Sequence, residues 1–329
     1  GGAMRIGQAA SDALIDGEEG RYMRSLKSVL GTPLAHEKRL IGGKRRSLVE
    51  VITAFLAELK RRAEAEAGTS FRQVLSGRPV HFHTADPERD AQAQADLRGC
   101  YLAAGFDEVT FMPEPEAAAR ASIGDVGETG LIVDIGGGTS DFTVYRRHTQ
   151  GIEIVGSHGV RLGGTDFDHA ISFSHVMPEF GLGGELTRTL ADGRLPVPKS
   201  IYVDLSTWAM IPFLYTAETR RMVDDLVVHA VDRPRMERLR SVLRDELGHD
   251  VAFAVERGKI AANGGARGEI KLGLVEPGLS VAVTEGSMNA SLREAREVLE
   301  RALYETLTLT GTAPGAVDHV VLVGGSSLM

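Results

Sequence analysis

The sequence predicts an α/β protein of two domains, and three observations lead to that prediction. The chain has 329 residues, which at roughly 100–200 residues per domain favours two domains or one large bilobal one. The pattern over residues 80–122 alternates between strand and helix, which favours an α/β layer. Residues 130–155 predict a meander of three strands joined by a glycine turn, and residues 200–262 predict a mostly helical segment.

The composition is that of a globular protein and excludes several classes. Hydrophobic residues make up 43% of the chain and charged residues 25%, which excludes wholesale disorder. The net charge is −8 and no block of Lys and Arg stands out, so neither a nucleic-acid partner nor a membrane surface is expected. The single cysteine excludes an intrachain disulfide and a cysteine-based zinc site. No apolar run reaches the ~18–20 residues that a bilayer requires, and no signal-peptide pattern opens the chain, so the cytoplasm is the expected compartment.

The first part of the chain is polar and turn-rich as far as Gly43. Apolar residues at helical spacing then predict an amphipathic helix over residues 47–67 that ends near Gly68. Four further elements are predicted, in this order: a strand over residues 80–83, a helix over 87–104, a strand over 108–112 and a helix over 115–122.

The second part of the chain predicts strands around a helical segment. The expected elements are strands over 130–134, 141–145 and 152–155, helices over 165–175, 201–231, 234–247 and 251–262, and strands over 269–275 and 279–284. A long helix over 287–309 follows, with Ser287 as its N-cap. The last buried strand, residues 317–323, runs into a glycine turn, which predicts a truncated domain because a natural end is usually peripheral.

The most informative segment is the glycine-rich turn between two of these strands. It consists of Asp134, Ile135, Gly136, Gly137, Gly138, Thr139, Ser140 and Asp141. Three glycines let the backbone turn tightly and approach a ligand without Cβ obstruction. Successive amides in such a turn can bind one anion, and Thr139 adds a hydroxyl donor. The turn therefore predicts a phosphate-binding hairpin, with an ordinary tight hairpin as the alternative.

Two aspartates flank this turn and predict a cation beside the phosphate. Asp134 and Asp141 would repel a phosphate unless a cation lies between them, and Mg²⁺ takes oxygen ligands while keeping several waters. No Gly-Lys-Ser/Thr follows, which excludes a Walker A loop. A strand rather than a helix follows the glycines, which argues against a dinucleotide-binding loop.

Five segments in a fixed order carry a resemblance to a known family. Residues 134–142 resemble the second phosphate motif of the actin-like ATPase superfamily. The other four segments resemble motifs of the DnaK-type heat-shock chaperone branch. They are residues 114–119, 162–168, 255–259 and 321–327. Residues 26–31 and the Gly105–Phe106 region are most similar to the YegD-like subgroup.

The resemblance implies an actin-like (ribonuclease H-like) two-lobed ATPase fold. Lobe I would span residues 5–123 and lobe II residues 124–329, with a helical subdomain over about 170–275. The implied function is the ATP-binding module of a DnaK-like molecular chaperone, with ATP or ADP and Mg²⁺ bound between the lobes. Unfolded polypeptide clients and co-chaperones would bind through parts that lie outside this sequence.

Site residues carry over from the family residue by residue. The implied catalytic residues are Lys27, Glu114, Asp134, Thr139 and Asp141, and the two aspartates would hold the metal through water. The implied nucleotide-binding residues are Gly136, Gly137, Gly138, Thr139, Gly163, Gly164, Glu256, Lys259, Gly324, Gly325 and Ser326. Glu256 and Lys259 lie three residues apart and so share a helix face. They would bind the ribose, with a solvated salt bridge as the alternative.

The chain departs from the family pattern in ways that bear on activity. The family's first phosphate loop, Asp-x-Gly-Thr-x-x-Ser, is absent, so weak or absent hydrolysis is expected. Ile260 and Leu328 stand where two family arginines sandwich the adenine, which removes a cation–π contact. Residues 80–90 also lack the pattern of the family segment that couples nucleotide to substrate binding.

Two other functions stay open. A non-catalytic actin-like scaffold or interaction module, with weak or lost nucleotide binding, is favoured by those departures. A small-molecule kinase would share the second phosphate hairpin, because a fold alone does not fix function.

Overall fold

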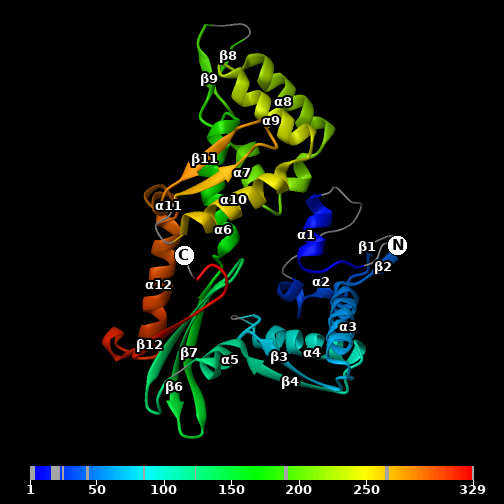
Figure 1. The fold of residues 1–329 in the computed structure, drawn as a ribbon, viewed down its shortest axis with the longest axis vertical. Helices are drawn as coiled ribbons and strands as arrows, with labels where there is room; N and C mark the ends of the chain where they lie inside the picture. Colours follow the sequence, from blue (N-terminus) through cyan, green and yellow to red (C-terminus); the bar gives the residue numbers. More distant parts are fainter. Residues whose placement is uncertain are drawn as a thin grey trace. The chain divides into compact units, whose positions relative to one another are not determined.

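The computed structural model describes residues 4–15, 23, 26–41, 44–83, 86–122, 124–188, 192–263 and 267–327. The chain divides into two compact units, Gly1–Ile123 and Gly124–Met329, called here the N-terminal and C-terminal units (Figure 1). No helix in the described ranges is long and apolar enough to cross a membrane.

The N-terminal unit is built from helices and short strands. Its elements are α1 (Gln8–Ile15), η1 (Leu26–Val29), α2 (Pro33–His36), β1 (Arg39–Ile41), β2 (Lys44–Arg46), α3 (Leu48–Ala67), β3 (Gln73–Arg78), α4 (Pro87–Ala103), β4 (Glu108–Pro113) and α5 (Glu114–Ala121). Helix α3 confirms the prediction for residues 47–67. Ser47 and Glu50 form a capping box at its start, and Gly68 ends it with φ 65°.

The predicted strand over residues 80–83 is wrong. The strand that pairs in parallel with β4 is β3, and Val74, Leu75 and Ser76 lie opposite Val109, Thr110 and Phe111. Residues 80–83 form a loop held by α4, because the amides of Phe82 and His83 both donate to the Asp90 carboxylate. The apolar alternation of Val80 and Phe82 is typical of a strand, but hydrogen bonds to Asp90 on the following helix hold these residues as a loop.

Asp90 is expected to stabilise this loop. Burial alone would raise the pKa of its carboxyl, but the amides of His83 and Phe82 and the Arg78 guanidinium outweigh burial and lower it. Asp90→Asn is therefore expected to lower the free energy of unfolding at pH 7 by about 1–3 kcal/mol, measured by urea unfolding.

The pH dependence of the unfolding free energy tests whether the Asp90 carboxylate is responsible. The contribution of a carboxyl with a lowered pKa is present above its unfolded-state pKa and is lost as the pH falls through the folded-state value. The difference between wild type and Asp90→Asn should therefore shrink below the ordinary carboxyl pKa. Glu66→Gln, an exposed position on α3, should show little difference at any pH. An equal loss for both variants would contradict the role of Asp90.

A four-stranded sheet in the order β12-β5-β6-β7 forms the base of the C-terminal unit. Its strands are β5 (Thr129–Ile135), β6 (Ser140–His148), β7 (Gly151–Val160) and β12 (His319–Val323). β12 runs parallel to β5, and the β5–β6 and β6–β7 pairs are antiparallel. Helix α12 (Arg293–Leu309) packs on β6 and β7, where Leu307 joins Leu131 and Val144 in an apolar cluster.

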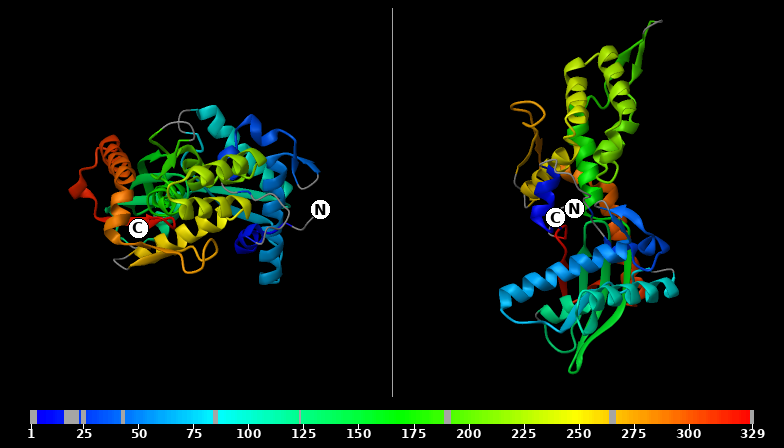
Figure 2. Two further views of the ribbon diagram at one scale, coloured as in Figure 1. Left: turned by 90° about the horizontal axis from the view of Figure 1, so that it is seen from above. Right: turned by 90° about the vertical axis from the view of Figure 1, so that its right-hand side faces the viewer.

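A mostly helical segment follows α6 (Gly164–Ile171). Its other elements are β8 (Glu185–Thr187), β9 (Arg194–Pro196), α7 (Ser200–Ser206), α8 (Ala217–His229), α9 (Arg233–Arg244), α10 (Gly248–Ala262), β10 (Gly268–Lys271), β11 (Ser280–Val283) and α11 (Glu285–Ser291). α8 and α9 run side by side (Figures 1 and 2). Fully buried side chains such as Tyr202, Phe180 and Leu239 form the core of this segment.

Three predicted helices differ from those observed. The helix predicted over 287–309 is two helices, α11 and α12, separated at Leu292, whose φ of −96° and ψ of 7° leave the helical region. Thr284 rather than Ser287 caps α11, because the Thr284 side chain accepts from the Ser287 amide. The helix over 165–175 changes to a π-helical turn after Ile171, and the helix over 201–231 divides into α7, a 3₁₀ turn over Ile211–Leu214, and α8.

Candidate functional site

The glycine bend, Gly136–Thr139, joins the ends of β5 and β6. It is not helical, and the Gly136 amide donates to the Thr139 carbonyl at 2.9 Å, which closes the turn. Gly137, Gly138 and Thr139 are exposed. The sequence predicted a hairpin at this position, and the structure has one.

The bend fits an anion. Among the described residues, no acceptor is recorded for the amides of Gly137, Gly138 and Thr139. A Cβ built at Gly137 or Gly138 would have no heavy atom within 4 Å, so the space beside the backbone is open. Successive amides of such a turn can bind phosphate oxygens.

The two flanking aspartates are direct neighbours across the strands. In the β5–β6 register Asp134 lies opposite Asp141, so both side chains project from the same face of the sheet. Two carboxylates so placed repel each other and favour a cation between or beside them. Their oxygen chemistry suits Mg²⁺, which is bound by one or two carboxylates plus water and phosphate.

The first turn of helix α6 forms hydrogen bonds to the glycine bend. The Gly164 amide donates to the Gly136 carbonyl at 2.9 Å, and the Thr165 amide donates to the Gly137 carbonyl at 2.7 Å. The Thr165 hydroxyl donates to the same Gly137 carbonyl at 2.8 Å. Gly163 and Gly164 therefore lie against the bend itself. Their predicted contact with a nucleotide stays a prediction.

The turn after β12 reaches the same place. Because β12 is parallel to β5, with Val323 opposite Asp134, the turn that follows it lies beside the bend. The Ser326 amide donates to the Ile135 carbonyl at 3.3 Å. A Cβ at Gly164 would lie 2.5 Å from the Ser326 hydroxyl oxygen. Three glycine-containing segments, distant in sequence, thus converge at one edge of the sheet.

In the N-terminal unit the structure pairs two of the predicted catalytic residues. The ammonium of Lys27, on η1, donates to the carboxylate of Glu114, the first residue of α5. Both side chains are exposed, at 48% and 38% of their surface, so the pair is accessible to a ligand.

Helix α10 carries Glu256 and Lys259, the two residues predicted to bind ribose, and they differ in burial and in partners. Glu256 is half-buried, whereas the Lys259 side chain is only 5% exposed and its ammonium lies 2.8 Å from a carboxylate oxygen of Asp168 on α6. The alternative of a solvated Glu256–Lys259 salt bridge is therefore wrong. Ile260 is 64% exposed. Leu328 lies outside the described residues.

Sequence reasoning gave no role to Asp168. It belongs to the Leu-Gly-Gly-x-Asp-Phe-Asp segment, but its partner Lys259 lies on a different helix and the sequence contains no signal that joins them. Only the fold brings the two together.

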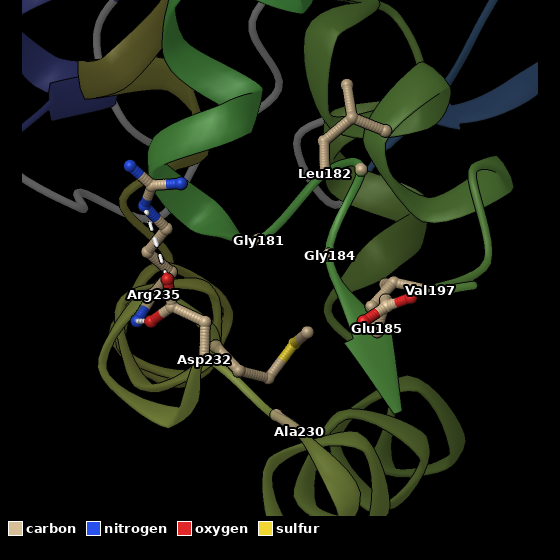
Figure 3. A pocket seen from close by; sticks show the side chains of 10 residues that line it. Gly181, Leu182, Gly184, Glu185, Val197, Ala230, Asp232 and Arg235 are labelled. Atoms are coloured by element: carbon tan, nitrogen blue, oxygen red, sulfur yellow. Dashed lines mark hydrogen bonds and ion pairs between the residues drawn. The ribbon is translucent and has the colours of Figure 1, made fainter. Parts of the chain in front are cut away.

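A small pocket lies in the helical segment, between residues 181–185 and the start of α9 (Figure 3). Its volume is about 100 Å³, below the roughly 300–1,000 Å³ that is usual for ligand sites. Arg235 and Asp232 form an ion pair of 3.6 Å among its lining residues. None of the predicted site residues lines it, so it is separate from the glycine bend.

Comparison with known proteins supports the chaperone resemblance. The relatives include proteins described as chaperone protein HscA homologues. The one from Aeromonas hydrophila is 31% identical over 204 residues, covering 60% of this chain and 32% of the relative. The one from Pseudomonas aeruginosa is 38% identical over 144 residues, covering 43% and 22%, and the one from Pseudomonas putida is 32% identical over 207 residues, covering 56% and 32%. The matched segments thus span about a third or less of these relatives.

The family described as Hsp70 protein matches residues 6–188. This range includes η1 with Lys27, the start of α5, the glycine bend and α6. The finer assignment to the YegD-like subgroup stays a prediction. The α/β elements are those of an actin-like ATPase domain, and the chain belongs to the Hsp70 family.

Proposed function

We propose that this chain is the nucleotide-binding module of an Hsp70-type molecular chaperone and binds ATP together with Mg²⁺. The observation that carries the proposal is the convergence of the glycine bend, the start of α6 and the turn after β12 at one edge of the sheet. An edge at the carboxyl ends of strands suits a nucleotide phosphate. Here it has three successive amides with no acceptor recorded among the described residues, and two carboxylates that lie opposite each other.

Each group has a distinct task in this proposal. The amides of Gly137, Gly138 and Thr139 would bind phosphate oxygens, and the Thr139 hydroxyl would add a donor. Asp134 and Asp141 would hold Mg²⁺ through water, and the ion would supply charge neutralisation of the phosphates. Phosphoryl transfer depends mainly on positioning and electrostatic stabilisation, so these groups are of the right kind.

Two further residues would act on the terminal phosphate. Lys27 would stabilise negative charge there, and Glu114 would orient the attacking water. The two side chains are paired with each other, so both would lie close to the same phosphate.

The scaffold function is the second candidate, and Ile260 favours it. The side chain is exposed and cannot replace the cation–π contact of an arginine with adenine. A protein that kept the fold but lost tight nucleotide binding would tolerate this residue. Binding of clients and co-chaperones is proposed only for a full-length Hsp70-type chaperone, not for this chain.

A thermal-shift experiment separates the two candidates. ATP with Mg²⁺ should raise the melting temperature, because a ligand that binds only the native state stabilises it by roughly 2.7 kcal/mol at 100 times its Kd. Asp134→Ala should abolish that rise. The matched control is Asp224→Ala, an exposed carboxylate on α8, which should keep the full rise.

Two outcomes would contradict the nucleotide proposal. No rise at millimolar ATP in the wild type would favour the scaffold. A rise that survives Asp134→Ala would place the ligand elsewhere on the protein.

A further inference from the structure

We propose that Asp96, a buried carboxylate on α4, is a positioning residue for Lys27 and that it acts by holding the turn that follows η1. This inference rests on the proposed function, because the task of Lys27 at the terminal phosphate is part of that proposal. Asp96 itself lies outside the segments that carry the sequence resemblance.

Asp96 is buried although it is a carboxylate. Its side chain is 3% exposed, and aspartate is almost never fully buried unless it is paired. One carboxylate oxygen accepts the Gly31 amide at 2.9 Å. The other accepts the side-chain amide of Gln92 at 2.7 Å and lies 3.2 Å from Nε2 of His36. Because a buried carboxylate is costly unless donors satisfy it, the bond to Gly31 holds the backbone at that residue.

The turn at Gly31 lies directly against α4. Its φ is +73°, and a Cβ there would lie 2.4 Å from the Arg89 carbonyl oxygen and 3.0 Å from the Ala93 Cβ. The preceding residue, Leu30, is 1% exposed and belongs to an apolar cluster that includes Ala93. The Leu30 carbonyl oxygen lies 2.8 Å from Nε2 of His83. Residues 30 and 31 are therefore fixed by their backbone as well as by side-chain packing.

Lys27 is connected to this turn through η1. The Leu30 amide donates to the Lys27 carbonyl at 3.4 Å. The amide and the hydroxyl of Thr32 both donate to the Val29 carbonyl, at 3.2 and 2.6 Å. The backbone of Lys27 therefore follows the position of Gly31. A lysine side chain has much rotamer freedom, so the place where its ammonium acts depends on where its backbone is held.

A displaced Lys27 should affect the terminal phosphate rather than the whole nucleotide. ATP has that phosphate and ADP lacks it. The contribution of a positioned group falls steeply when it moves by about 1 Å. Loss of the Asp96 carboxylate should therefore weaken ATP binding and spare ADP binding, whereas a general loosening of the N-terminal unit would weaken both.

The test is calorimetry of ATP and ADP, each with Mg²⁺, on the full chain. Asp96→Ala and Lys27→Met should each weaken ATP binding about tenfold and leave ADP binding within about twofold of the wild type. The double variant should bind ATP no more weakly than Lys27→Met does, because both changes remove the same contact. Asp96→Asn should keep most of the ATP affinity, since its carbonyl oxygen can still accept the Gly31 amide.

Arg98→Met is the matched control on the same helix. The Arg98 guanidinium donates to the Val109 carbonyl at 2.6 Å, so it connects α4 to β4 and not to η1. This variant should bind ATP and ADP as the wild type does.

Several outcomes would overturn the inference. Equal losses of ATP and ADP affinity in Asp96→Ala, or a loss that adds to that of Lys27→Met, would mean that Asp96 only stabilises the unit. The same holds if Asp96→Ala keeps wild-type ATP affinity, or if it weakens ATP binding while Lys27→Met does not. If Asp96→Ala does not fold, Asp96→Leu removes the acceptors without leaving a cavity, and the same outcomes decide.

A second readout needs no nucleotide. In protein whose lysines carry isotope-labelled methyl groups, which keep the charge, the Lys27 resonance is assigned by its absence in Lys27→Arg. It should shift in Asp96→Ala, because the ammonium moves relative to its partner Glu114. The resonance of Lys60, which pairs with Glu64 within α3, should not shift. If the wild type binds neither nucleotide but the Lys27 resonance shifts, the proposed function fails and the positioning role stands. An unchanged Lys27 resonance overturns the positioning role whether or not nucleotide binds.

Discussion

Gly163→Ala is expected to displace the glycine bend and to lower ATP affinity at least tenfold. A Cβ at this position would lie 2.6 Å from the Gly138 nitrogen and 2.8 Å from both the Gly136 oxygen and the Gly137 carbonyl carbon. All three are backbone atoms, so none can move as the end of a flexible side chain would. The Gly163 amide also donates to Asp166 at 2.9 Å, which resists a shift of the glycine itself. The free energy of unfolding should fall by about 1–3 kcal/mol, measured by urea unfolding.

Gly137→Ala is the matched control for that substitution. A Cβ there would have no heavy atom within 4 Å, so the ATP-free protein should unfold at the wild-type urea concentration. It should nevertheless bind ATP more weakly, because the methyl group would occupy the space beside the amides proposed for phosphate. If Gly163→Ala binds ATP and unfolds as the wild type does, the bend is not braced by α6.

The elements that the sequence predicted well are those with local causes. Helix α3 has its capping box and its terminating glycine within the helix and its flanks. Strands β5 and β6 and the bend between them follow from an apolar run, three glycines and an alternating run. Local hydrogen bonds and glycine conformations fix such features, so a single sequence is sufficient to find them.

The elements that the sequence missed have no clear marker in their own residues. The loop at residues 80–83 is held by Asp90 on the following helix, and the hairpin of β1 and β2 lies in a stretch whose polar residues gave no strand signal. The break at Leu292 between α11 and α12 shows no proline or glycine that would mark it.

In the site, too, the sequence identified single residues but not the pairs that they form. The motifs identified Lys27 and Glu114 separately, but their pairing joins positions 87 residues apart in the chain. The Lys259–Asp168 pair likewise joins α10 to α6. A family motif identifies residue types in order, and it does not show which of them form ion pairs with each other.

The second large effect is expected at Gly324, which begins the turn after β12. Its φ of +83° lies in the left-handed region, where an L-residue costs roughly 1–2 kcal/mol. A Cβ there would also lie 2.4 Å from the Ile135 oxygen and 2.8 Å from a carboxylate oxygen of Asp134. Gly324→Ala should therefore lower the free energy of unfolding by at least about 2 kcal/mol, since strain and collision act together.

Gly324→Ala should also weaken ATP binding, because the turn cannot move away from Ile135 without loosening the end of β5 beside Asp134. Gly325→Ala is the adjacent control: a Cβ there meets nothing within 4 Å, so urea unfolding should be unchanged. If the two alanine variants unfold alike, the turn after β12 does not pack against the end of β5. If Gly324→Ala is destabilised but keeps wild-type ATP affinity, Asp134 holds its position without the turn, and the convergence of the three glycine segments is structural rather than part of the nucleotide site.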